Sequence, residues 1–277
     1  MRLSTLAAVF LVLLGAPGCS RESPTPAASA PAAPAPDPVP ATAPAEPCRL
    51  TMGWDPWEPY HYVDPAGEEK GLDVELVVAI AAGAGCGITF ERDHWANLLR
   101  RVAEGDVDLI SGATETEERK TYAWFSEPYR QEVFVLFTGP DADERFPGGT
   151  LQAKLDAGMR VGVTDAYLYG GGVETLRDDP AYSDAFVGAA IGETSVTRLV
   201  NGEIDGFLED RFVAAAVIRR RGLEEQVSAD LVVSTENVRL MFSKASVDRE
   251  LVERFNESMA RMRAAGEFDA IQSRYLH

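Results

Sequence analysis

Three polar residues that could bind a small charged molecule follow two copies of one sequence pattern. Residues 101–110 (RVAEGDVDLI) and 198–207 (RLVNGEIDGF) each read as the end of an amphipathic helix, a glycine C-cap and a short buried strand. Thr114 and Arg119 follow the first copy, and Asp210 follows the second. Ligands of open α/β sheets bind at the carboxyl edge of the strands. The sequence therefore predicts two similar lobes that present a cation and an anion to one cleft, which suits a small zwitterion.

Each of these side chains has a binding role and a structural alternative. An arginine bonds a carboxylate through two parallel hydrogen bonds that lysine cannot reproduce, and the hydroxyl of Thr114 can add a donor. The carboxylate of Asp210 can accept from an ammonium. However, Arg119 lies four residues after Glu115, a spacing that also forms surface ion pairs on helices. Asp210 is equally suited to N-cap the helix that follows it.

Composition excludes several classes of function. The chain has 277 residues, enough for two domains, and a formal net charge of −18. That charge argues against nucleic-acid binding, which needs a basic face to neutralise phosphates. The three histidines, His61, His94 and His277, have no metal-ligand spacing. We expect no metal and no cofactor.

The N-terminal segment reads as an export signal followed by a tether. Residues 1–18 carry a basic head and an apolar run too short to span a bilayer. Cys19 then stands where bacterial lipoproteins are acylated, although a plain secretory signal is the alternative. Residues 19–47 are rich in Pro and Ala and favour an extended spacer. We expect a periplasmic or cell-surface protein that touches the membrane only through a lipid on Cys19.

Two further cysteines indicate a disulfide. In an exported protein, paired cysteines are the more common case. Cys48 precedes the first expected strand and Cys86 precedes the second. If these strands are parallel neighbours, their first residues lie within reach of disulfide geometry. We therefore predict a bond between Cys48 and Cys86.

The hydrophobic pattern predicts an α/β fold with two lobes and two hinge crossings. We assign residues 48–138 and 235–277 to lobe 1 and residues 139–234 to lobe 2, with a crossing strand at 132–138 and a return crossing at 231–234. Strands are further expected at 49–54, 88–91, 107–111, 159–164, 206–208 and 238–243. Helices are expected at 72–84, 95–103, 150–157, 167–176, 195–200, 211–221, 248–264 and 268–275.

Six short runs, in order and with consistent spacing, resemble a known family. They are 57–64 (WEPYHYVD), 71–76 (GLDVEL), 95–99 (WANLL), 105–110 (GDVDLI), 114–119 (TETEER) and 125–129 (FSEPY). Together they resemble the amino-acid-binding family of bacterial extracellular solute-binding proteins, the capture components of ABC importers. The resemblance spans residues 49–277.

The resemblance implies a two-lobed periplasmic-binding-protein fold, type II-like, that traps a ligand and docks on a membrane permease. Arg119 matches the arginine that binds the ligand α-carboxylate, and Thr114 matches a hydroxyl beside it. Asp210 matches the carboxylate that holds the α-ammonium. Trp57 lies where an aromatic side chain commonly stacks on the ligand, with Tyr60 just beyond. We expect a monomer with a small zwitterionic ligand and an ABC permease as partners.

One segment departs from the family pattern. Relatives often place a glycine and a hydroxyl residue after the strand that ends near residue 164, whereas this chain has TDAYLYGGG at 164–172. Asp165 would oppose a bound anion, and Tyr167 or Tyr169 is expected to reshape the pocket. Trp95 is expected to pack in the core.

The leading interpretation is a non-enzymatic protein that captures an amino acid or a similar zwitterion and delivers it to an ABC permease. A first alternative is an enzyme similar to the cyclohexadienyl dehydratases of this fold group, with Glu58, Glu209 or Asp210 as the acid. A second alternative is a lipoprotein that senses the ligand without transporting it.

Overall fold

A disulfide joins the first residues of two neighbouring parallel strands. Cys48 begins β1 (Cys48–Trp54), Cys86 begins β4 (Cys86–Arg92), and the two residues are in register. The predicted disulfide is confirmed. The computed structural model describes residues 48–275.

All described elements belong to one compact unit, residues 46–277. The expected signal peptide (1–18), the lipidation site Cys19 and the tether (19–47) lie outside the described residues. None of the helices in the described part of the chain is long and apolar enough to cross a membrane.

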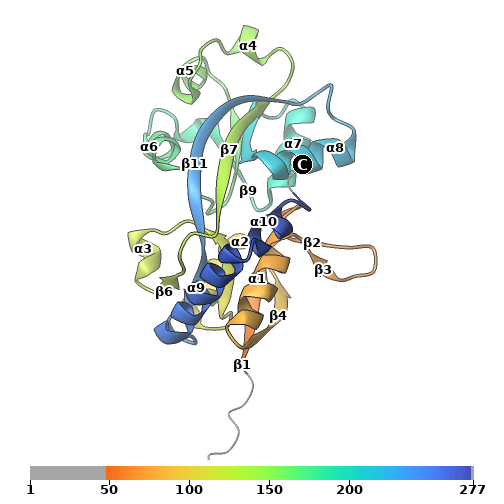
Figure 1. Ribbon diagram of the computed structural model, residues 1–277. Coiled ribbons are helices and arrows are strands. Elements are labelled where there is room, and N and C mark those ends of the chain that lie inside the picture. Colours follow the sequence, from red (N-terminus) through yellow and green to blue (C-terminus); the bar gives the residue numbers. More distant parts are fainter. Residues whose placement is uncertain (1–47, 276–277) are drawn as a thin grey trace, which may run out of the picture. The chain divides into compact units, whose positions relative to one another are not determined.

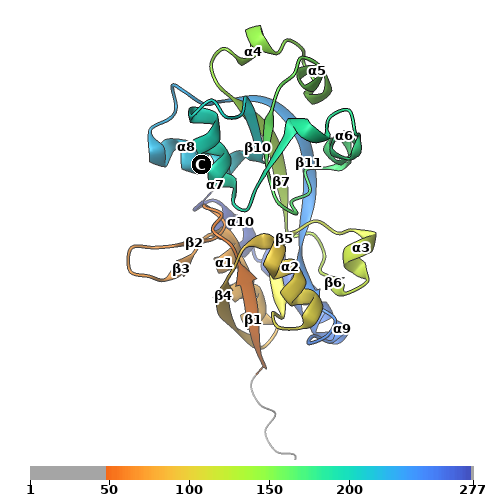
Figure 2. The same cartoon turned by 180° about the vertical axis from the view of Figure 1, so that it is seen from behind.

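The first lobe is a parallel three-stranded sheet with helices on both faces. One hydrophobic cluster packs α1, α9 and α10 against one face, and another packs α2 against the opposite face (Figure 2). Its strands are β1, β4 and β5 (Leu109–Ala113). Its helices are α1 (Leu72–Gly83), α2 (Trp95–Glu104), α9 (Arg249–Ala264) and α10 (Glu267–Gln272).

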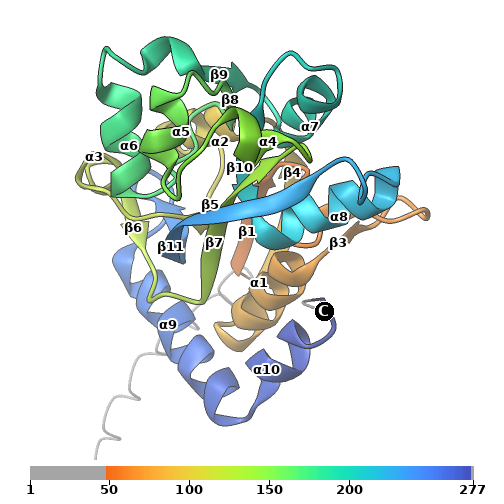
Figure 3. The ribbon, with the colours of Figure 1, turned by 90° about the horizontal axis from the view of Figure 1, so that it is seen from above.

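The second lobe repeats this arrangement. In Figure 3, α5 and α6 lie on one side of its strands and α7 and α8 on the other. The parallel strands are β8 (Val161–Thr164), β9 (Phe186–Ala189) and β10 (Gly206–Asp210). The helices are α4 (Ala142–Arg145), α5 (Leu151–Asp156), α6 (Gly171–Asp178), α7 (Gly192–Val200) and α8 (Arg211–Arg221).

Two long antiparallel strands connect the lobes (Figure 1). They are β7 (Arg130–Thr138) and β11 (Ser228–Ser243), and they give the sheet order β4-β1-β5-β11-β7-β10-β8-β9, with β6 (Ala123–Phe125) beside β11. Separate strands at 231–234 and 238–243 were the wrong prediction, because Thr235, Glu236 and Asn237 stay paired with β7. Their polar side chains interrupt the apolar pattern of the sequence, but their backbones remain paired with β7.

The segment before α6 also differs from the prediction. A helix was expected to start at residue 167, but α6 begins at Gly171. Gly170, inside the expected range, has φ 92°, which a right-handed helix cannot include, and it is the N-cap of α6. Tyr169 is then buried, and its hydroxyl accepts a hydrogen bond from the Thr164 amide at 2.7 Å. The shortest elements were not foreseen either: β2 (Tyr62–Val63), β3 (Glu69–Lys70), β6, α3 (Glu117–Lys120), α4 and β9.

Candidate ligand-binding site

A cavity lies where the two lobes and the crossing strand β7 meet. Its wall combines aromatic, small polar and charged side chains from both lobes. It is lined by Asp55, Trp57, His61, Trp95, Ser111, Gly112, Thr114, Arg119, Glu132, Phe134, Tyr167 and Leu168. Four of the predicted ligand contacts are thus brought together: Trp57, Thr114, Arg119 and Tyr167. Two others, Tyr60 and Asp210, are not part of this lining.

Arg119 brings a buried guanidinium to the cavity. It lies in α3, whose first turn is capped by the Thr116 side chain, and it is only 6 % exposed. Its Nη1 donates to the Thr114 carbonyl at 3.0 Å and its Nη2 to the Ala166 carbonyl at 3.3 Å. Burial lowers the pKa of Arg119 below its usual value. Among the described residues no carboxylate lies within ion-pair distance of this guanidinium, so its charge is available to an anionic ligand.

The alternative ion pair between Glu115 and Arg119 does not form. Glu115 precedes α3 and instead lies 2.9 Å from the Lys120 amine and 3.0 Å from Arg239 Nε. The i, i+4 spacing applies only when both residues are in one helix. A surface helical pair is therefore the wrong explanation of Arg119.

The unusual loop after β8 closes over Arg119. Ala166 has a left-handed backbone conformation. Its carbonyl oxygen accepts hydrogen bonds from Arg119 Nη2 and from Trp95 Nε1, the latter at 3.2 Å. Trp95 is buried in the core as expected, but it also lines the cavity. Asp165 is exposed and is not part of the cavity lining. The loop therefore reaches the first lobe without directing a carboxylate at the site.

Two carboxyl groups that the sequence did not single out line the same cavity. Asp55 follows β1 and accepts a hydrogen bond from the Tyr167 hydroxyl at 3.1 Å. Burial raises the pKa of Asp55 to about 7. Glu132 lies on β7, is 3 % exposed, and burial raises its pKa well above the usual value. Both carboxyls thus lack a full counter-charge, which a cationic ligand group could supply.

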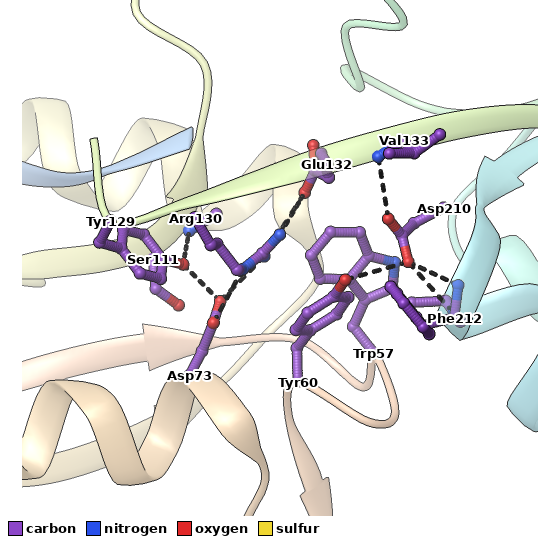
Figure 4. Close-up of polar contacts among 12 residues, drawn as sticks. Trp57, Tyr60, Asp73, Ser111, Tyr129, Arg130, Glu132, Val133, Asp210 and Phe212 are labelled. Atoms are coloured by element: carbon purple, nitrogen blue, oxygen red, sulfur yellow. Dashed lines mark hydrogen bonds and ion pairs between the residues drawn. The ribbon is translucent and has the colours of Figure 1, made fainter. Parts of the chain in front are cut away.

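Glu132 belongs to a buried network of charged residues that also includes Arg130 and Asp73 (Figure 4). Arg130 donates to Asp73 through Nε (2.9 Å) and Nη2 (3.0 Å), and its Nη1 and Nη2 each lie 3.5 Å from Glu132 Oε1. The guanidinium carbon lies 3.8 Å from the ring centroid of Tyr60. Tyr129 donates its hydroxyl proton to Asp73. The strong, two-point contact of Arg130 is with Asp73, and Glu132 receives only the longer contacts.

Asp210 serves as the N-cap of α8, as the structural alternative predicted. Its Oδ1 accepts from the Phe212 amide (2.9 Å), the Val213 amide (3.3 Å) and the Tyr60 hydroxyl (3.2 Å), and its Oδ2 accepts from the Val133 amide (3.3 Å). The side chain is 1 % exposed. Tyr60 is equally buried and contacts Asp210 rather than the cavity.

Trp57 separates the cavity from a second hollow between the lobes. Its indole lines both and donates from Nε1 to Glu209 Oε1 at 3.1 Å. Burial raises the pKa of Glu209 to about 8. His61 also borders both spaces, and burial lowers its pKa to about 4, so the ring is neutral at pH 7. Its Nε2 lies 2.7 Å from the Ser111 hydroxyl.

One of the two missed carboxyls had a recognisable signal. Asp55 directly follows a buried strand, at the same carboxyl edge that pointed to Thr114 and Asp210. Glu132 is inside a crossing strand, where a glutamate next to β-branched and aromatic residues reads as a solvent-facing position. Its place in the site follows only from the packing of β7 between the lobes.

Comparison with known proteins identifies the family. The model of the bacterial extracellular solute-binding proteins, family 3, matches residues 50–277. The chain belongs to this family. A probable histidine-binding protein of Neisseria gonorrhoeae is 25 % identical over 222 residues, 79 % of this chain and 79 % of that protein. The arginine-binding extracellular protein ArtP of Bacillus subtilis is 24 % identical over 239 residues, 82 % of this chain and 86 % of ArtP.

Solved structures agree on the fold. A histidine kinase sensor domain with similarity to periplasmic binding proteins superposes with a TM-score of 0.72 at 22 % identity, covering 83 % of this chain and 96 % of that domain. The two-lobed periplasmic-binding-protein fold of this family 3 protein is thus confirmed.

Proposed function

We propose that this protein captures an amino acid outside the cytoplasm by enclosing it between its two lobes. The observation that carries the proposal is Arg119, a buried guanidinium on the cavity wall with only backbone carbonyls as hydrogen-bond partners. A ligand carboxylate would supply its missing counter-charge and could accept two parallel hydrogen bonds. Thr114 would add a hydroxyl donor, and Trp57 and Tyr167 would pack on the ligand.

The charges on the wall favour an amino acid with a basic side chain. The cavity presents one guanidinium, Arg119, and two carboxyls, Asp55 and Glu132. An amino acid with a cationic side chain carries the complementary set of one anion and two cations, whereas a neutral side chain would leave one buried carboxyl without a partner. The names of the relatives, which bind histidine and arginine, support this class.

We further propose that the protein is a monomer, anchored to the membrane through lipidated Cys19, and that it delivers its ligand to an ABC permease. We propose residues 48–138 and 235–277 as lobe 1 and residues 139–234 as lobe 2. Family membership supports the transport role. Uptake of a labelled amino acid by cells with and without the gene separates transport from sensing. Transport predicts that uptake falls in the deletion strain, and a sensor without transport predicts unchanged uptake.

Thermal unfolding of the purified protein with each proteinogenic amino acid tests the binding role. A ligand at a thousand times its dissociation constant stabilises the folded state by about 4 kcal/mol, a shift of about 10 °C for a domain of this size. We expect the largest shifts with arginine, lysine or histidine. Arg119→Lys should abolish them, because an ammonium cannot reproduce the two-point contact.

The matched control is Arg100→Lys, which changes an exposed arginine that pairs with Glu104 in α2. This variant should keep the full ligand-induced shift. The proposal is wrong if no amino acid shifts the unfolding midpoint, or if Arg119→Lys and Arg100→Lys respond to ligand equally.

A further inference from the structure

The backbone of the loop after β8 uses the hydrogen-bond donors that a ligand carboxylate would need. The Ala166 carbonyl accepts from Arg119 Nη2 at 3.3 Å and from Trp95 Nε1 at 3.2 Å. Arg119 is the residue proposed to bind the ligand carboxylate. Ala166 has φ 61°, a left-handed conformation that is uncommon for residues other than glycine. Its oxygen therefore occupies a position where one oxygen of a ligand carboxylate would accept from Arg119.

The side chain of the next residue, Tyr167, lies between two tryptophans of the cavity wall. Its ring centroid is 6.1 Å from that of Trp57 and 5.8 Å from that of Trp95, and the ring meets both indoles edge-on. Its hydroxyl donates to Asp55 Oδ2 at 3.1 Å. Tyr167 also packs against hydrophobic clusters of both lobes. It thus fills the space between the indoles that an aromatic or cationic ligand side chain would use.

Little room remains in the cavity beside these groups. The centre of a water-sized sphere can reach only about 30 Å³, which is enough for about two water molecules. An amino acid has at least a carboxylate, an ammonium group and the carbon between them, and it does not fit. A ligand that binds Arg119 must therefore displace the loop.

We propose that Ala166 and Tyr167 form a built-in substitute for the ligand, which holds the empty protein closed and which an amino acid must displace. This inference rests on the proposed capture of an amino acid at Arg119. Arg177 Nη1 donates to the Tyr167 carbonyl at 2.9 Å, and the Tyr167 amide donates to the Thr164 carbonyl at 3.2 Å. Because these bonds hold the loop to the second lobe, opening of the lobes withdraws Ala166 and Tyr167 from the first lobe together.

The substitute lowers the affinity for every ligand by the same factor. Whatever the ligand is, its binding breaks the contacts of the Ala166 carbonyl and the Tyr167 hydroxyl, so only the fraction of protein without these contacts can bind. A ligand carboxylate can displace the carbonyl because its full charge forms the stronger bond with Arg119. A cationic side chain can likewise replace the hydroxyl at Asp55. The tyrosine ring, once its hydroxyl has left Asp55, remains free to pack against the ligand.

Tyr167→Phe tests the substitute, because it removes the hydroxyl and keeps the ring. Calorimetric titration at pH 7 measures the affinities of wild type and variant for arginine, lysine and histidine. The variant should bind each ligand about threefold to tenfold more tightly, since the empty protein loses one net hydrogen bond. Tyr182→Phe is the matched control, because its hydroxyl donates to Asp156 within the second lobe. This control should keep the wild-type affinities.

Small-angle X-ray scattering gives a second readout, for which the empty proteins suffice. Empty wild type should be as compact as wild type saturated with the best-bound of the three amino acids. Empty Tyr167→Phe should have a larger radius of gyration, which falls when that amino acid is added. Tyr182→Phe should behave as wild type does.

Two results would overturn the substitute. One is a Tyr167→Phe variant that binds the amino acids no more tightly than wild type, and the other is an empty wild type that is no more compact than empty Tyr167→Phe. If neither protein binds any of the three amino acids, the proposed function is wrong, and the scattering of the two empty proteins still tests the substitute.

Discussion

Arg130 and Asp73 form a buried, two-point ion pair between the crossing strand β7 and the first turn of α1. Nε lies 2.9 Å from Oδ1 and Nη2 lies 3.0 Å from Oδ2, with side-chain exposures of 2 % and 0 %. Burial alone would raise the pKa of Asp73, but the adjacent Arg130 charge lowers it below its usual value. The pair therefore ties the strand that connects the lobes to the core of the first lobe in a fully charged state.

Removal of the Asp73 charge should strongly destabilise the protein. Asp73→Asn leaves the buried Arg130 guanidinium with only the weaker 3.5 Å contact to Glu132 as an ion pair. Breaking a buried pair by neutralising one partner typically costs about 3–5 kcal/mol. We expect a loss of this size in the free energy of unfolding, measured by urea denaturation.

Glu75→Gln is the matched control, because it removes a carboxylate from the same helix. Glu75 pairs with Arg274 at the surface, where both side chains are more than a third exposed. Exposed pairs contribute little, so the unfolding midpoint should hardly change. Equal effects of the two substitutions would contradict a special role for the buried pair.

Local sequence signals were sufficient for most of the longer elements of this fold. The helix expected at 211–221 is α8, and the parallel pairing that was assumed for Cys48 and Cys86 is present. These features depend on the spacing of apolar residues and on helix-capping residues. The residues that give each signal lie within a few positions of one another in the sequence. Arg119 was recognisable because its motif places it just after the first repeat.

The part of the site on β7 could not be predicted in the same way. Arg130, Glu132 and Phe134 occupy alternate positions and so share one face of the strand. The sequence does not say which face is buried, because the partner Asp73 is 57 positions away. The same limit applies to Asp210, for which the N-cap and ligand roles have one local signature. Only tertiary packing shows that Asp210 Oδ1 caps α8 and that Oδ2 receives one hydrogen bond, from the Val133 amide.

The buried carboxyl of Glu209 should make stability depend on pH. Its folded pKa of about 8 exceeds the unfolded value near 4.5, so the folded state binds more protons between these values. The contribution of the Glu209 carboxyl to the free energy of unfolding therefore falls as pH rises from about 4.5 to 8. Asp55 acts in the same direction up to about pH 7, and His61 acts in the opposite direction between about pH 4 and 6.5. Above pH 7, Glu209 is the main contributor of the three.

Glu209→Gln should make the fall in stability between pH 7 and 8 shallower, while the buried Glu132, whose pKa burial also raises, still acts in the same direction. An amide oxygen can still accept the hydrogen bonds from Trp57 Nε1 and the Asp210 amide, but it carries no proton to lose. Thermal unfolding midpoints at a series of pH values from 6 to 8.5 measure the effect. Glu225→Gln, at an exposed position, should keep the wild-type slope. A slope in Glu209→Gln equal to that of wild type would show that the Glu209 carboxyl is already ionised at pH 7.

The ion pair between Glu58 and Arg220 should contribute modestly to ligand affinity. It joins the loop after β1 to α8 across the second hollow, and the same guanidinium also lies 3.0 Å from Glu193 of α7. Both ends of the cross-lobe pair are more than a third exposed, and pairs of this kind contribute at most about 1 kcal/mol. Glu58→Gln should therefore weaken binding of the best amino acid by no more than about fivefold.

The variant Glu193→Gln distinguishes an effect on closure of the two lobes from the effect of losing one negative charge, because Glu193 and Arg220 are both in the second lobe. Its pair does not depend on closure, so affinity should stay at the wild-type value. The weakening in Glu58→Gln should disappear at about 1 M salt, where exposed charges are screened within roughly 3 Å. Calorimetric titration at low and high salt measures both effects. An equal loss in the two variants would mean that net charge near the cleft, and not the cross-lobe contact, controls affinity.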